Sequence, residues 1–105
     1  MADEPKRYLA VVQFKSDTTL AELAHRVPGF QGKITNLSKG EMEQAFRTSD
    51  GLAFGVFFKS SLPRHVLWSE FDHGTSHGDS YMIIEAGPLL EQKGFGRAAA
   101  WLQHH

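Results

Sequence analysis

The central strand of this protein is predicted at Gly51–Lys59, which reads Gly-Leu-Ala-Phe-Gly-Val-Phe-Phe-Lys. Successive side chains of an extended strand point to opposite sides. One side of this strand would carry only bulky apolar residues and is predicted to face the core: Leu52, Phe54, Val56 and Phe58. The other side would carry two very small residues, an aromatic and a charge: Ala53, Gly55, Phe57 and Lys59. This second face suits a sheet surface that is closely approached or left open.

The residues before this strand are predicted to form a hairpin with it. Ser49-Asp50-Gly51 separates two apolar runs, and Asp-Gly is typical of tight hairpin turns. Residues 41–48 would therefore pair antiparallel with residues 52–59. Within 41–48 the apolar residues also fit a helix, so residues 32–48 are left open between one strand, two strands and a helix.

The N-terminal part predicts a disordered lead-in over residues 1–6, then a strand and a helix. Residues 8–14 are nearly all apolar or β-branched, as a buried strand would be. Thr19 and Glu22 fit a capping box, in which each side chain caps a backbone N–H of the first turn. An apolar stripe at helical spacing follows, and Pro28-Gly29 is predicted to end the helix.

The C-terminal part predicts one segment of uncertain type, a strand and a helix. Residues 62–71 follow a helix-start signature with Pro63, yet they fit either a helix or a strand. Residues 72–79 are rich in Gly, Ser and Asp and predict a loop, and residues 80–86 predict a strand. Residues 97–105 predict a final helix, and the sequence does not say whether His104 and His105 are native or belong to a tag.

This order predicts a ferredoxin-like βαββαβ sandwich of the α+β class with an added C-terminal helix. Two helices would cover one face of a four-stranded antiparallel sheet. Residues 7–105 would form a single domain, because a chain of 105 residues supports one modest core.

The composition narrows the class of function. A net charge of −1 lacks the basic field that tight nucleic-acid binding uses. The chain has no cysteine, which excludes disulfides and thiolate chemistry. No stretch reaches the ~20 apolar residues of a membrane span. We therefore expect a cytoplasmic protein without a cofactor, and without a membrane partner.

One segment has the residue types of a metal-dependent hydrolase. Asp72, His73, His77 and Asp79 lie within eight residues and could ligate a divalent ion that activates water. The same segment also reads as a solvated, glycine-rich connection, which is the more common role of such a sequence.

The favoured hypothesis is a non-enzymatic binding or regulatory module that forms a homo-oligomer or binds a protein partner. The interaction face would be an open sheet face or the C-terminal helix, and its residues would be Ala53, Gly55, Phe57, Lys59, Tyr81 and Trp101. The alternative is weak single-stranded nucleic-acid binding. Bases would stack on Tyr8, Phe57 and Tyr81, and phosphates would contact Lys59, Arg64 and Arg97.

Overall fold

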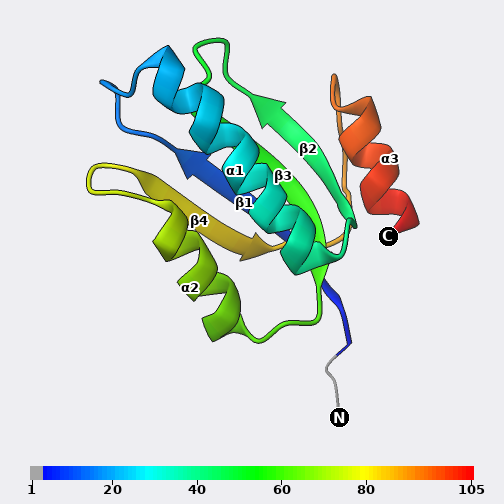
Figure 1. The fold of residues 1–105 in the computed structure, drawn as a ribbon. Helices are drawn as coiled ribbons and strands as arrows, with labels where there is room; N and C mark the ends of the chain where they lie inside the picture. The colour runs from blue at the N-terminus through cyan, green and yellow to red at the C-terminus, as the bar shows by residue number, and fades with distance from the viewer. Residues whose placement is uncertain (1–3) are drawn as a thin grey trace.

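The computed structural model describes residues 4–105, which form four strands and three helices (Figure 1). In chain order they are β1 (Lys6–Gln13), α1 (Leu20–Ser38), β2 (Met42–Arg47), β3 (Ala53–Ser60), α2 (Arg64–Gly74), β4 (Ser80–Glu85) and α3 (Gly96–His104). The predicted lead-in over residues 1–6 falls partly on residues 1–3, which lie outside the described residues. Lys6 already belongs to β1.

The four strands form one antiparallel sheet in the order β2-β3-β1-β4. Helices α1 and α2 lie together on one face of this sheet (Figure 1). The predicted α+β ferredoxin-like sandwich with an added C-terminal helix is therefore confirmed. Among the described residues, no helix combines the length and apolarity that crossing a membrane would need.

The core lies between the sheet and the two helices. Phe54, Val56 and Phe58 of β3 are at most 1% exposed, as their alternation predicts. They meet Phe30 of α1 and Phe71 of α2, whose rings pack against each other at 5.2 Å between centroids. The burial of these side chains contributes to the hydrophobic stabilisation of the domain, together with the aliphatic residues of the same core.

Helix α1 is longer than predicted, because it passes through Pro28 and Gly29 and ends at Ser38. Its start agrees with the capping box, since Thr19 Oγ1 accepts from the Glu22 N–H at 3.2 Å. Beyond the proline, Phe30 and Ile34 continue the buried stripe of Leu23 and Val27. The free energy gained by burying Phe30 and Ile34 is larger than the free energy lost because Pro28 cannot donate a helical hydrogen bond. The expectation that the helix ends at Pro28-Gly29 is thus wrong, and residues 32–38 are helical.

The structure also decides the other segments whose secondary structure the sequence left open: residues 42–47 belong to a hairpin, and residues 64–74 form a helix. Residues 42–47 form the predicted strand and pair with β3. In the turn, Gly51 adopts a φ of +76°, and the Asp50 carboxylate accepts from the Leu52 N–H at 3.0 Å. Residues 64–74 form helix α2, so the start of the predicted 72–79 loop is the last turn of this helix.

Candidate functional site

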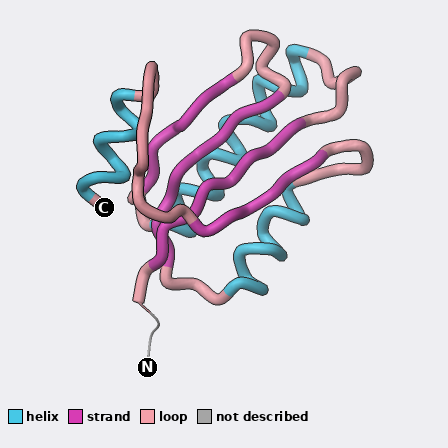
Figure 2. The backbone as a smooth tube through the Cα atoms, turned by 180° about the vertical axis from the view of Figure 1, so that it is seen from behind, coloured by secondary structure: helices cyan, strands magenta, loops and turns pink. Residues whose placement is uncertain are grey.

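Helix α3 covers the β2 and β3 half of the second sheet face (Figure 2). Its Trp101 ring stacks on Phe57 of β3 at 6.3 Å between centroids. Arg97 of α3 pairs with Glu43 of β2 at 3.2 Å, and Arg7 of β1 donates to the Leu102 carbonyl at 2.6 Å. The apolar side of α3 is therefore used within its own chain.

Gly55 of β3 makes room for a neighbouring side chain on this half of the sheet face, which α3 covers. A Cβ placed on Gly55 would lie 2.3 Å from the Phe46 ring. The small residue thus lets the aromatic ring of the neighbouring strand lie flat against β3. The close approach expected for this face comes from the chain itself.

The structure brings together only part of the predicted interaction face. Ala53, Gly55, Phe57 and Lys59 share the outer side of β3, and Trp101 lies against Phe57. Trp101 is only 9% exposed, and Phe57 is half-buried beneath it. Tyr81 lies on the opposite face, where its ring packs on Phe71 at 5.9 Å.

The proposed stacking platform for bases is not assembled on one face. Tyr8 stacks on the core residue Phe58 at 5.3 Å, so Tyr8 and Tyr81 both face the helices. Phe57 faces the other way, beneath Trp101. No single surface of the described chain therefore presents these three rings to a strand of nucleic acid.

No helix of the described chain lies over the other half of the second sheet face, above β1 and β4 (Figure 2), and the side chains there form an apolar strip. Leu9 lies opposite Ile84, and Val11 lies opposite Met82, in the β1–β4 pairing. Met82 is 55% exposed and Ile84 is 49% exposed. We call Leu9, Val11, Met82 and Ile84 the apolar strip.

The free edge of β4 borders this strip and retains unpaired backbone groups. The Ala86 N–H donates to the Arg7 carbonyl at 2.8 Å. Because antiparallel strands bond through alternate residues, Ile84 and Met82 also bond to β1, while Tyr81, Ile83 and Glu85 direct their N–H and C=O groups outward. Within residues 4–105, β1 is the only strand that pairs with β4, so these three amides point away from the hydrogen bonds of the sheet.

A groove runs along the same edge on the helix side of the sheet. It has a volume of about 420 Å³ and lies between α2 and β4, with Trp68 of α2 57% exposed in its wall. Its lining combines apolar, aromatic and charged side chains: Lys6, Tyr8, Arg64, Leu67, Trp68, Tyr81, Ile83 and Glu85. The β4 edge is thus flanked by exposed apolar side chains on both faces of the sheet.

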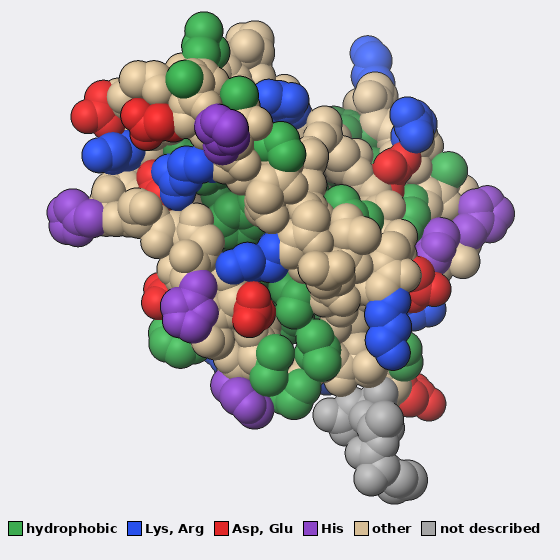
Figure 3. Space-filling view, viewed as in Figure 1, with side chains coloured by type: hydrophobic (Ala, Val, Ile, Leu, Met, Phe, Trp, Pro, Cys, Tyr) green, Lys and Arg blue, Asp and Glu red, His purple; other side chains and the backbone are tan. Residues whose placement is uncertain are grey.

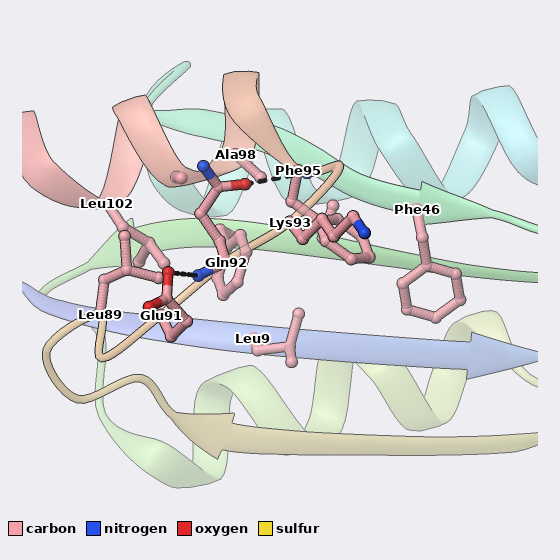
Figure 4. A pocket seen from close by; sticks show the side chains of 12 residues that line it. Leu9, Phe46, Leu89, Glu91, Gln92, Lys93, Phe95, Ala98 and Leu102 are labelled. Atoms are coloured by element: carbon pink, nitrogen blue, oxygen red, sulfur yellow. Dashed lines mark hydrogen bonds between the residues drawn. The ribbon is translucent and has the colours of Figure 1, made fainter.

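An apolar pocket that shares Leu9 with the apolar strip lies under the segment that leads into α3 (Figure 4). Its volume is about 420 Å³, and its floor includes Leu9 and Phe57. Gln92 shapes the covering segment, because its side-chain oxygen accepts from the Phe95 N–H at 3.2 Å. The pocket has the size of small-molecule sites, and its polar lining is limited to Glu91, Gln92 and Lys93.

The candidate metal ligands do not converge. Asp72 and His73 lie in the last turn of α2, and His77 lies in the following turn. Across the described residues, no three His, Asp or Glu side chains are arranged to hold an ion. Histidine side chains lie at several separate places in the space-filling view of the helix face (Figure 3).

Asp79 has a structural role. Its buried carboxylate accepts from Arg26 at 2.6 Å, from the Ser76 N–H at 2.8 Å and from the Lys15 N–H at 2.9 Å. Burial alone would raise the pKa of the Asp79 carboxyl, but these hydrogen bonds and the Arg26 charge outweigh burial and lower the pKa. A carboxylate engaged in this way is not a free metal ligand.

Comparisons with protein-family models, with curated proteins and with solved structures find no match for this chain. The surface around β4 was only partly predictable from the sequence. The four consecutive apolar residues Tyr81–Ile84 predict a strand, but they do not show which of its faces is covered.

Proposed function

We propose that this chain is a non-enzymatic binding module that self-associates through the uncovered β1 and β4 half of its sheet. The observation that carries the proposal is the apolar strip, in which Met82 and Ile84 are about half exposed beside Leu9 and Val11. Contiguous apolar surface of this kind marks interaction sites on small domains. The C-terminal helix is a weaker candidate, because its apolar side packs on β3.

The placement of the other candidate residues supports a binding role over catalysis. Asp79 is engaged by Arg26 and two backbone amides, and the aromatic rings suggested for base stacking face opposite sides of the sheet. The net charge of −1 also gives no electrostatic drive toward nucleic acid. A cytoplasmic location is part of this proposal and fits a cysteine-free chain.

Light scattering coupled to gel filtration tests the proposal. The wild-type chain is expected to show the mass of two chains at high concentration and to dissociate on dilution. Ile84→Asp is expected to weaken association at least about tenfold, because it places an unpaired charge in the interface.

Leu20→Asp is the matched control. Leu20 is 81% exposed on α1, away from the strip, so the same change there should leave association unaltered. Circular dichroism would confirm that both variants keep the fold. A single-chain mass for the wild type at all concentrations, or equal weakening by both variants, would contradict the proposal.

A further inference from the structure

We infer that the second copy binds edge to edge, with β4 of one chain pairing antiparallel with β4 of the other. The inference rests on the proposed self-association and specifies its geometry. Tyr81, Ile83 and Glu85 hold unpaired backbone N–H and C=O groups on this edge, and a second strand would satisfy them. The partner is therefore a strand with the same outward-facing backbone.

Exposed apolar side chains on both faces of the sheet favour the edge over the flat face as the contact. Met82 and Ile84 lie on the outer face, whereas Trp68 lies on the helix side, in the groove beside β4. A second sheet stacked on the outer face would cover the first two and leave Trp68 in water. A partner at the edge lies beside all three.

The two edges of the sheet differ in the features that prevent such pairing. The β2 edge has a bulge between Gln44 and Phe46, carries Glu43 and Arg47, and contacts α3. Bulges, charges and covering elements are the usual protection of an edge strand. The β4 edge has an apolar centre and a single charge, Glu85, at its end. Pairing is thus directed to β4.

The unpaired backbone groups also define the register. A two-fold axis beside Ile83 places Ile83 opposite Ile83 of the second copy, and Tyr81 opposite Glu85 of the second copy. Every outward-facing residue of β4 then has a partner, and each such pair exchanges two hydrogen bonds. A shift by two residues leaves at least one of these residues unpaired.

This register also gives complementary side-chain contacts. On the outer face it places Met82 beside Ile84 of the second copy, so the two apolar strips become continuous. On the helix side Glu85 meets a tyrosine, and no like charges face each other. Both features favour a symmetric pairing of identical strands.

Cysteine cross-linking tests the register cleanly, since the natural chain has no cysteine. Met82 and Ile84 of two copies would form a pair without hydrogen bonds, with Cα atoms about 4.5 Å apart, which a disulfide can span. An oxidised mixture of Met82→Cys and Ile84→Cys is therefore expected to give the mixed disulfide. Each variant alone would place its cysteines diagonally, about 7–8 Å apart, and should cross-link at least about fivefold less.

The outcomes separate this inference from the proposed function. Leu20→Cys reports cross-linking by random collision, and the mixed disulfide must exceed that level. If light scattering shows a dimer but the single variants cross-link as well as the mixture, or nothing cross-links, the edge register is wrong and the proposed function stands. If light scattering shows the mass of a single chain at every concentration, both the edge-to-edge pairing and the proposed self-association are wrong.

Discussion

At the scale of single residues, the carboxylate of Asp79 connects three segments that are distant in sequence. It joins Arg26 of α1, the Lys15 amide after β1 and the Ser76 amide after α2. The Arg26 guanidinium also lies 4.4 Å from the centre of the Phe14 ring, a cation–π contact. One side chain thus fixes the connection that leads into β4.

Asp79→Asn is expected to lower the free energy of unfolding at pH 7 by about 1–3 kcal/mol, because an amide cannot replace a charged acceptor for Arg26. The folded-state pKa of Asp79 lies below the ordinary 3.8, so its contribution is complete above that pH and is lost as the pH falls through the lowered pKa. Urea unfolding at pH 7 and at pH 3 would show the difference between wild type and variant narrowing at the lower pH.

Asp17→Asn provides the control for this prediction. Asp17 is exposed, and its Oδ1 lies 3.7 Å from Lys15 Nζ. Loss of this exposed charge should change the free energy of unfolding by no more than about 0.5 kcal/mol. An Asp79→Asn chain as stable as wild type at pH 7 would show that this carboxylate has no stabilising role.

At the scale of elements, burial of its apolar side chains stabilises α1, although Pro28 in its interior disfavours a helix. Pro28 is exposed in the middle of the helix and cannot donate to the Ala24 carbonyl. Pro28→Ala restores that bond without removing core packing. We expect the free energy of unfolding to rise by about 1–2 kcal/mol, less than the full interior cost of proline because proline also restricts the unfolded chain.

Pro63→Ala is the matched control, and urea unfolding is the measurement. Pro63 caps the N-terminus of α2, where no helical hydrogen bond is lost, so its replacement should bring no comparable gain. A Pro28→Ala chain that is no more stable than wild type would show that the local backbone already compensates for the missing donor.

The elements that the sequence predicts well are those with a local physical signal. The alternation of Leu52, Phe54, Val56 and Phe58 identifies the core face of β3, and the Thr19–Glu22 pair identifies the start of α1. The end of α1 was mispredicted because Pro28-Gly29 is a strong local stop. The buried positions of Phe30 and Ile34, which overrule it, depend on the distant sheet.

The candidate site was harder to predict for the same reason. The outer side of β3 was expected to be available, but Trp101, more than forty residues further along the chain, stacks on Phe57. In Tyr81–Ile84 both faces are apolar, so no alternation shows that Met82 and Ile84 point away from the helices. Contacts between distant segments decide which apolar face remains exposed.

At the scale of the whole molecule, the sheet has one face covered by α1 and α2 and the other divided into two halves. Helix α3 occupies the β2 and β3 half (Figures 1 and 2). The apolar strip therefore lies next to the β4 edge, on the half of this face that α3 does not cover. A second copy at this edge would continue the sheet from one chain into the next. We therefore propose that this protein self-associates through β4.

Amide hydrogen exchange at high and low protein concentration tests self-association through this strand. The Tyr81, Ile83 and Glu85 amides are predicted to exchange slowly in the concentrated sample and quickly after dilution. The Met82 and Ile84 amides should remain slow in both, since they are bonded to β1 within one chain. Fast exchange at Tyr81, Ile83 and Glu85 at every concentration would contradict the claim.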